Sequence, residues 1–314
     1  MPVSLRYIAL RLLQVIPTFL LIMVVMFVLV RLLPGDPTSA LLGERATDEA
    51  VERINKQLGL DRPIVVQFGF FLDRLIVHGD LGESIVLKTS VIGLIFARLP
   101  VTLLLTAMAG MLALFLAVPL AFVAALRHGG LVDGSIRAGF QIGLSTPVFY
   151  LGILLLTLFA AQLHWFPVGG YGETIADKLY HLFLPALTLA LSLSAVLMRN
   201  LRNSIVEVLG AEYVDFARAK GLKPRVVLGK HVLRNAIIST VTLFGLNIGT
   251  LLGGAVITET VFAVPGAGRL MIDSIYGRDY PVILGLTLAL ALIVSLIFLI
   301  TDLIQAAIDP RVSA

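Results

Sequence analysis

The side chains that could perform catalysis are scattered along this 314-residue chain and form no catalytic pattern. The five histidines lie far apart, at His78, His128, His164, His181 and His231. The sequence contains no GxxxxGK(S/T) phosphate loop, no HExxH zinc motif and no GxSxG nucleophile motif. It has no cysteine, which excludes disulfides and thiolate metal sites. We therefore expect no catalytic site and no metal site. Any activity that requires an input of energy would need a partner that supplies it.

The most distinctive polar feature is a charged segment between two long apolar runs. It reads EYVDFARAKGLKP at 212–224 and continues to KHVLRN at 230–235. Ser204 and Glu207 have the spacing of a capping box, and after a break at Gly210 a short helix is expected over 211–220. Gly221 and Pro224 should end this helix.

One face of this predicted helix is apolar. Tyr213, Phe216 and Ala217 share it at helical spacing, which predicts a helix that docks against a protein outside the bilayer. The alternative is an amphipathic helix that rests on lipid headgroups. The acids Glu212 and Asp215 fit that alternative poorly, because they would face anionic lipid.

The elements that must position this helix are apolar. The chain is 58% hydrophobic and only 14% charged, unlike a soluble domain. Six segments have at least about 17 mostly apolar residues, enough to cross a bilayer core of about 30 Å. They are 7–33, 101–126, 137–163, 180–198, 237–262 and 282–303. No strand-like alternation competes with them, so we predict an all-α integral membrane protein with six transmembrane helices in one domain, 1–314. Three prolines interrupt these spans and predict kinks: Pro119, Pro147 and Pro185.

Basic residues predict the orientation, because they mark cytoplasmic loops. Eight Lys and Arg crowd residues 199–234, whereas the long loop at 34–100 holds nine acids and seven basic residues. We therefore expect both termini and the loop 199–235 inside and the loop 34–100 outside. The net charge of +4 reflects this sidedness and not a nucleic-acid surface. The first apolar run exceeds that of a signal peptide and is interrupted by Arg31, so we expect a retained anchor.

The outer loop is expected to contain two helices. One is predicted at 48–58, capped by Thr47, and the other at 64–77, ended by Gly79. The loop could be a lid on the outer ends of the spans or a landing surface for a soluble partner.

Small residues recur every four positions on two spans. They are Gly245, Gly249 and Gly253 on the fifth, and Ala109, Ala113, Ala117 and Ala121 on the second. Such stripes let backbones approach closely, so these two spans are candidates for a tight inner layer. The glycine stripe could pack within the subunit, meet a helix of a second subunit, or line a pore.

The deep positions of the spans offer only neutral polar groups. Gln141, Asn247 and Thr250 are candidate pore-lining residues, although Gln141 and Asn247 could instead make helix-to-helix hydrogen bonds. Charges are expected only near the membrane surfaces, Arg31 and Glu259 outside and Arg199 and Asp302 inside. The sequence therefore has no obvious carriers for a proton relay.

The charged segment resembles the cytoplasmic signature of ATP-binding cassette (ABC) importer permeases: Glu-Ala-Ala, three residues, Gly, nine residues, then Ile-x-Leu-Pro. Here Asp215-Phe216-Ala217 stands for the triplet and Gly221 keeps its spacing, while His231, Leu233 and Arg234 occupy the closing positions. Four signature residues are replaced, but the result is similar to the variant ARAKG…HVLRNA of the dipeptide, oligopeptide and nickel permease family, first-permease (B-type) subunit.

Other stretches carry the same resemblance along nearly the whole chain. They are LLPGDP (32–37), LGLD (58–61), GDLG (79–82), GG (253–254), Glu259, VF (261–262), PG (265–266), GR (268–269) and RDYP (278–281). The resemblance implies the type I importer permease fold in a bacterial inner membrane. It also implies a complex of two permeases, two cytoplasmic ATPases that bind ATP and Mg²⁺, and an external solute-binding protein, with no cofactor in this chain.

The resemblance assigns roles to particular residues. The loop after the fourth span would insert into a groove of one ATPase, with Glu212, Asp215, Ala217 and Gly221 transmitting ATP-driven closure. Arg269, Arg278 and Asp279 are candidate contacts with the binding protein, or they could pair with neighbouring charges and stabilise the outer helix ends. The second permease is expected to be a paralogue.

Peptides are the leading substrate class that the resemblance implies, followed by nickel chelates, glutathione-like tripeptides and some sugars. Two other functional classes stay open. A secondary transporter is disfavoured because the sequence shows neither an inverted repeat nor a midplane charge. A membrane scaffold would explain a docking helix without transport.

Overall fold

The computed structural model describes residues 5–32 and 62–308. In these ranges the only strand-like pairing is an isolated bridge between Glu83 and Ser90. The helices are α1 (Leu5–Leu32), α4 (Ile64–Val77), α5 (Val91–Leu126), α6 (Leu131–Ser145), α7 (Val148–Leu155), the π-helix η2 (Leu156–Gln162), α8 (Ile175–Leu209), α9 (Glu212–Ala219), α10 (Pro224–Val226), the π-helix η3 (Val227–Leu233), α11 (Arg234–Val261), α12 (Ala267–Tyr276) and α13 (Tyr280–Ile308). The predicted all-α class is confirmed.

The described residues contain four or five stretches that could cross a membrane. Four helical stretches are long and apolar enough to cross a membrane: Val91–Leu126, Ile175–Leu209, Pro224–Val261 and Tyr280–Ala306. The pair α6 and α7–η2 makes a fifth if it is counted as one bent span. In α1 the apolar stretch among the described residues, Ile16–Leu29, is shorter than a full span. The described part of the chain thus supports four or five spans, and six stays a prediction.

The kink predicted at Pro147 in the span at 137–163 is confirmed, because the chain turns by 104° between α6 and α7. Thr146 at this turn has extended backbone angles, φ −86° and ψ 127°. The ring of Pro147 disfavours helical angles at the preceding residue, and proline has no amide hydrogen to continue the helix. Pro119 and Pro185, by contrast, lie inside the continuous helices α5 and α8.

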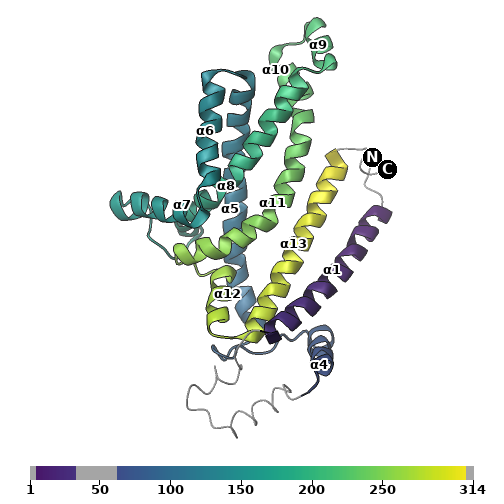
Figure 1. Ribbon diagram of the computed structural model, residues 1–314, viewed down its shortest axis with the longest axis vertical. Coiled ribbons are helices and arrows are strands. Elements are labelled where there is room, and N and C mark those ends of the chain that lie inside the picture. The colour runs from purple at the N-terminus through teal and green to yellow at the C-terminus, as the bar shows by residue number, and fades with distance from the viewer. Residues whose placement is uncertain (1–4, 33–61, 309–314) are drawn as a thin grey trace.

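α5 and α8 form the centre of the bundle (Figure 1). The alanine stripe of α5 is fully buried, in one cluster with the leucines of α8. Because alanine is small, the two backbones approach closely and dispersion contacts are dense. The expected tight layer of α5 with α11 is therefore corrected: α8 is the main neighbour of α5, and α11 packs chiefly on α8.

The glycine stripe of α11 faces α13 over part of its length. A Cβ added at Gly245 would clash with the side chain of Thr301, and one at Gly249 would touch the ring of Phe298. Gly245 therefore lets α13 approach the backbone of α11. No described atom lies within 4 Å of a Cβ added at Gly253, so this part of the stripe is open in the single chain.

The two ends of the bundle differ. Figure 1 shows α12 and α4 at one end and α9 at the other. Phe27 of α1 packs against Phe68 and Phe71 of α4, with ring centroids 5.2 and 5.7 Å apart. The predicted helix at 64–77 is confirmed as α4, and Gly79 with φ +61° follows its end. The helix expected at 48–58 lies outside the described residues.

Candidate functional site

The predicted docking helix is α9, and its end is set by backbone chemistry. It runs over Glu212–Ala219, which confirms a short helix at this place. Its C-terminus is a Schellman motif: the amide of Gly221 donates to the carbonyl of Arg218 (2.9 Å), and that of Leu222 donates to the carbonyl of Ala217 (3.3 Å). Gly221 has φ +75°, in the left-handed region that disfavours residues with a Cβ.

The predicted capping box at Ser204 and Glu207 is wrong, because Ser204 lies inside the continuous helix α8. Its hydroxyl is instead 2.9 Å from Oγ of Ser239 on α11. The capping box of α8 is at its other end, where Thr174 and Asp177 each accept a hydrogen bond from the other's backbone amide. The spacing of a capping box therefore does not mark the start of a helix where the flanking residues continue the same helix.

α9 turns Val214 and Ala217 toward its own chain, so only Ala217 of the predicted docking face is buried. Val214 is fully buried and Ala217 nearly so, in the same cluster as Val227 of η3. Tyr213 and Phe216, which the sequence predicts beside Ala217, are exposed, Phe216 by 68%. Ala217 thus belongs to the base of α9, together with Val214, which the sequence analysis missed.

The exposed apolar side chains around α9 form what we call the docking surface: Tyr213, Phe216, Leu222 and Val226, each at least 40% exposed. Asp215 and Arg218 form an ion pair beside it, with a distance of 3.2 Å between Oδ1 and Nη1. Large apolar side chains that gather on an exposed surface indicate a site of protein interaction. α9 and α10 lie at the far end of the bundle from α12 (Figure 1).

Hydrogen bonds join α9 and its neighbours to the long helices. The hydroxyl of Tyr213 accepts a hydrogen bond from Nδ2 of Asn235 in α11 (3.1 Å). Asn200 of α8 donates to the hydroxyls of Ser239 (3.1 Å) and Thr240 (3.2 Å) in α11. The chain enters α11 through the π-helix η3, a type of helix that is frequent at functional sites. Hydrogen bonds thus link α9 to α11, and α11 to α8.

A buried ion pair near the same end links α6 to α8, and the sequence analysis did not single it out. Nε and Nη2 of Arg202 lie 3.1 and 2.5 Å from the two carboxylate oxygens of Asp133. The amide of Gly129 also donates to Asp133 (3.0 Å), and Nε of Arg137 lies 3.5 Å away. A sequence shows that these charges exist but not that α6 and α8 bring them together.

The three candidate pore-lining residues make hydrogen bonds within their own helices. Gln141 donates to Oγ of Ser145 (3.3 Å), Asn247 to the carbonyl of Leu243 (2.8 Å), and Thr250 to the carbonyl of Asn247 (2.6 Å). Within the described chain, Gln141 and Asn247 make no helix-to-helix hydrogen bond. Gln141 and Thr250 are exposed, and Asn247 is half-buried.

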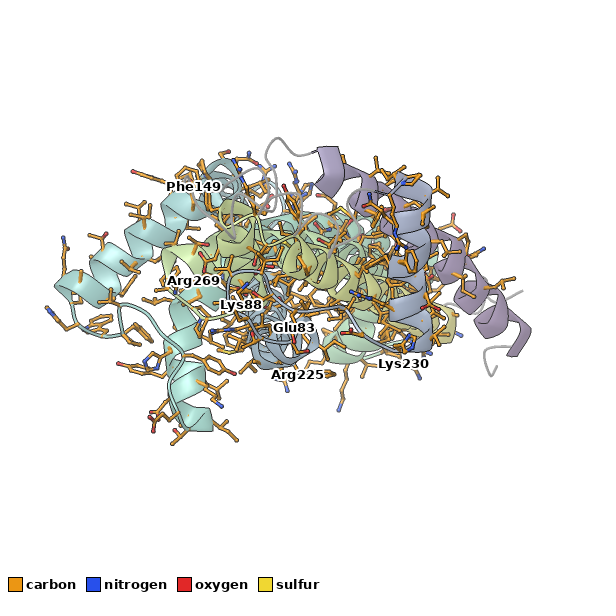
Figure 2. The ribbon with its side chains drawn as sticks, turned by 90° about the horizontal axis from the view of Figure 1, so that it is seen from below. Glu83, Lys88, Phe149, Arg225, Lys230 and Arg269 are labelled. Carbon is orange, nitrogen blue, oxygen red and sulfur yellow. The ribbon has the colours of Figure 1, made fainter. Side chains whose placement is uncertain are left out.

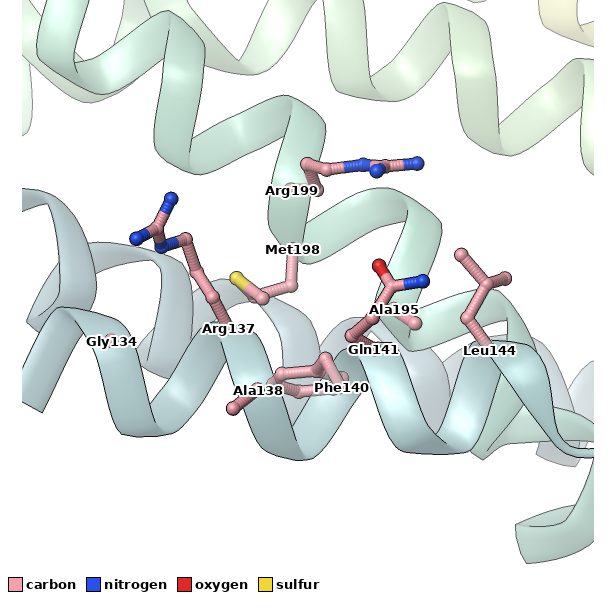
Figure 3. A pocket seen from close by; sticks show the side chains of 9 residues that line it. All are labelled: Gly134, Arg137, Ala138, Phe140, Gln141, Leu144, Ala195, Met198 and Arg199. Carbon is pink, nitrogen blue, oxygen red and sulfur yellow. The ribbon is translucent and has the colours of Figure 1, made fainter.

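A cavity of about 360 Å³ lies between α6 and α8 (Figure 3). It is lined by Gly134, Arg137, Ala138, Phe140, Gln141, Leu144, Ala195, Met198 and Arg199. The sequence singled out Gln141 for polarity and Arg199 for its place near the inner surface. Their common position became visible only through the packing of α6 on α8.

At the end of the bundle where α12 lies, Glu259 of α11 is fully buried. Its carboxylate accepts hydrogen bonds from Oγ1 of Thr102 in α5 (2.6 Å) and from the amide of Arg269 (2.9 Å). Oγ1 of Thr102 in turn accepts from the amide of Ala267 (2.8 Å). These amides open α12, where an acidic group is favourable. A Cβ at Gly266 would clash with this carboxylate, which explains a glycine there.

Asp279 differs from the exposed residue that a contact with a binding protein requires. It is buried, and its carboxylate accepts hydrogen bonds from the hydroxyl of Ser84 and from the amides of Ile85 (3.0 Å) and Val86 (3.2 Å). Asp279 thus holds the end of the outer loop against the α12–α13 corner.

The two predicted arginine contacts are more exposed. Nε of Arg269 lies 4.0 Å from the carboxylate of Asp273, and its side chain is partly exposed. Arg278 is exposed and has φ +53°. Glu83 and Lys88, which Figure 2 labels in the view from the α12 end, are also exposed. This end therefore carries exposed charges of both signs.

Known proteins resemble this chain in sequence over nearly its whole length. Residues 117–314 match the model of the family described as binding-protein-dependent transport system inner membrane component, and residues 4–106 match its N-terminal membrane component. The glutathione transport system permease protein GsiC of Pectobacterium atrosepticum is 42% identical over 98% of this chain and 99% of its own length. The oligopeptide transport system permease protein AppB of Bacillus subtilis is 40% identical over 98% of both chains.

Solved structures show the fold. The MetNI methionine ABC transporter in an inward-facing conformation is similar with a TM-score of 0.59 at 19% identity, over 69% of this chain and 96% of that chain. An amino acid ABC transporter solved with histidines has a TM-score of 0.51 at 17% identity, over 70% and 94%. The predicted type I importer permease fold and inner-membrane location are confirmed. The chain therefore belongs to the family of binding-protein-dependent transport system inner membrane components, the permeases of ABC importers.

Proposed function

We propose that this chain imports di- and oligopeptides as one of two permease subunits that together enclose the translocation pathway. Its partners are a second, paralogous permease, two cytoplasmic ATPases that bind ATP and Mg²⁺, and an external solute-binding protein. The chain itself contributes no catalytic site. Relatives that are 38–42% identical over nearly the whole chain are named as peptide or glutathione permeases, which supports the substrate class.

The coupling role is supported by the way α9 packs, with one side buried and the other exposed. Its buried side, Val214 and Ala217, packs against its own chain, and the docking surface on its other side is exposed. We propose that an ATPase groove receives this surface, with Glu212 and Asp215 at its edge. Because hydrogen bonds join this region to α8 and α11, motion of the ATPase would tilt both helices.

The exposure of particular side chains supports the proposed pathway and outer contact. Gln141 and Thr250 are exposed and Asn247 half-buried, which suits a pathway completed by the second permease. The open end of the glycine stripe at Gly253 suits close contact with that subunit. At the outer end, Arg269 and Arg278 are accessible to a binding protein, whereas Asp279 is buried and holds residues 84–86.

Glutathione is the specific alternative substrate, because one relative with 42% identity is named as a glutathione permease. Glutathione is itself a small peptide, so the two proposals share the same apparatus. Uptake of each candidate by the complex reconstituted with its binding protein separates them.

The coupling role is tested at Gly221. In Gly221→Val, a β-branched side chain would have to adopt left-handed angles, at a cost of about 1–2 kcal/mol, so we expect substrate-stimulated ATPase activity to fall roughly tenfold. Gly221→Asn is the matched control, because asparagine tolerates these angles, and a Cβ at this position meets no described atom within 4 Å.

The readout is ATPase activity of the reconstituted complex with and without peptide-loaded binding protein. If peptide-loaded binding protein stimulated the ATPase activity of Gly221→Val fully, the coupling role would be contradicted. If the complex with the original glycine assembled but no peptide stimulated its ATPase activity, the peptide assignment would be contradicted. The family membership would not be affected.

A further inference from the structure

The outer helix α4 exposes an apolar stripe, which we define as Val65, Leu72 and Ile76. Val65 and Ile76 are 77% and 69% exposed, and Leu72 between them is partly exposed. Their spacings of seven and four residues put the three side chains on one side of the helix. Apolar side chains that gather on a surface mark a contact with another protein or with a membrane.

The neighbours of α4 place it at the depth of the membrane spans. The rings of Phe68 and Phe71 lie 5.2 and 5.7 Å from that of Phe27, which belongs to the apolar stretch of α1. The same cluster includes Ile283 and Leu284 of the span α13. Because α4 is packed against the sides of two apolar helices, it lies beside them at the edge of the bilayer and not far above it.

The exposed surface next to α4 is a surface that meets lipid. Figure 1 shows α1 at the edge of the bundle and α4 beside its end. In α1, Val25, Val28 and Leu29 are exposed in the same apolar stretch as Phe27. Apolar side chains that are exposed on a helix of this kind face hydrocarbon in a membrane. The stripe of α4 therefore continues a lipid-facing surface.

The charged groups of α4 limit how deeply it lies. Arg74 is two residues from Ile76, about half a turn around the helix, so it points away from the stripe. Arg62, just before the helix, has its guanidinium carbon 4.8 Å above the ring centroid of Phe70, and Asp73 is exposed. Charges are expensive in the hydrocarbon centre, whereas a helix with one apolar and one charged face is stable among the headgroups.

We infer that α4 is an interfacial helix, whose stripe inserts into the lipid leaflet at the α12 end of the bundle and whose arginines, Arg62 and Arg74, lie among the headgroups. The partner of this surface is phospholipid and not the solute-binding protein, because α4 is attached at the depth of the spans. The lipid then holds the start of the segment that leads to Ser84, and Asp279 holds its other end.

The test measures the surroundings of single cysteines, which is direct because the chain has none of its own. Val65→Cys and Ile76→Cys each carry a small fluorophore, in the complete complex held in lipid nanodiscs. A nitroxide on the upper acyl chain should quench both labels. Iodide in the water should quench them at least about threefold less than it quenches Tyr276→Cys, since an interfacial helix buries its apolar face by about 5–10 Å.

Three further samples sharpen the comparison. Arg74→Cys, on the opposite side of α4, should be quenched by iodide as strongly as Tyr276→Cys, which is at an 85% exposed position. Val65→Asp combined with Ile76→Cys should raise iodide quenching of the label toward that level, because a charge in the stripe opposes its insertion. Val65→Leu combined with Ile76→Cys keeps the stripe apolar and should leave the quenching unchanged.

Each other outcome contradicts the inference for a separate reason. Iodide quenching of Val65→Cys and Ile76→Cys as strong as that of Tyr276→Cys means that the stripe lies in water. Protection from iodide that develops only when binding protein is added means that the stripe is a landing surface for that protein. Protection from both quenchers without binding protein means that protein, and not lipid, covers the stripe.

Discussion

At the scale of single residues, the outer end of the bundle depends on one buried carboxylate. Glu259 accepts hydrogen bonds from the hydroxyl of Thr102 and the amide of Arg269, and Thr102 accepts one from the amide of Ala267, so this network joins α5, α11 and α12. A buried acceptor with this many donors is expensive to remove, because each donor left without a partner loses its hydration as well. The sequence placed Glu259 near the outer surface but did not indicate that it is enclosed.

Glu259→Gln keeps the shape of the side chain but replaces an acceptor oxygen with an NH₂ group facing other donors. We expect the complex in detergent to lose roughly 1–3 kcal/mol of stability, measured by thermal or denaturant unfolding of this subunit. The control is Glu207→Gln in the exposed part of α8, which should change stability by less than about 0.5 kcal/mol. Equal stability of both variants would show that the Glu259 network does not hold α12.

At the scale of helices, residues with the same spacing have different environments. Gly245 and Gly253 lie on one stripe of α11, yet the first is pressed against Thr301 of α13 and the second faces no described atom. The hydroxyl of Thr301 donates to the carbonyl of Ile297, which limits how far this side chain can move away. The stripe therefore serves packing within the chain at one end only.

Gly245→Ala should overpack the α11–α13 contact and destabilise the isolated subunit by roughly 1–3 kcal/mol. Gly253→Ala, the same change two turns later, should be neutral or slightly stabilising, because alanine is the better helix former. Unfolding of the purified subunit measures both. Gly253→Leu adds a second readout: loss of the permease pair with the subunit intact would support a subunit contact at Gly253, whereas normal assembly would argue against it.

At the scale of the whole molecule, α9 and α12 lie at opposite ends of the bundle, which is the arrangement that the basic residues predict for the inner and outer sides (Figure 1). A permease needs this separation, because its energy source and its solute supply are on different sides of the membrane. The predicted sidedness of the termini and loops has a direct test, since the chain contains no cysteine.

Phe216→Cys on α9 and Tyr276→Cys on α12 each place one thiol at a highly exposed position, 68% and 85% exposed. A membrane-impermeant maleimide added to intact cells should label Tyr276→Cys alone, and added to inside-out vesicles it should label Phe216→Cys. The opposite pattern would reverse the predicted topology. Protection of Phe216→Cys in vesicles that contain the whole complex, but not in those that lack the ATPase, would support the proposed docking surface.

Much of this molecule followed from sequence alone. Apolar runs of membrane-spanning length, basic loops and the Gly221 stop signal predicted the helical class, the separate outer loop and the position of α9, because these depend on local composition and backbone chemistry. Tertiary packing decided the rest. It determined that Val214 and Ala217 of α9 are buried, that the alanines of α5 meet α8, and that a capping-box spacing falls inside a helix. It also enclosed Glu259 and brought Asp133 to Arg202, because contacts between residues distant in sequence depend on which helices pack together.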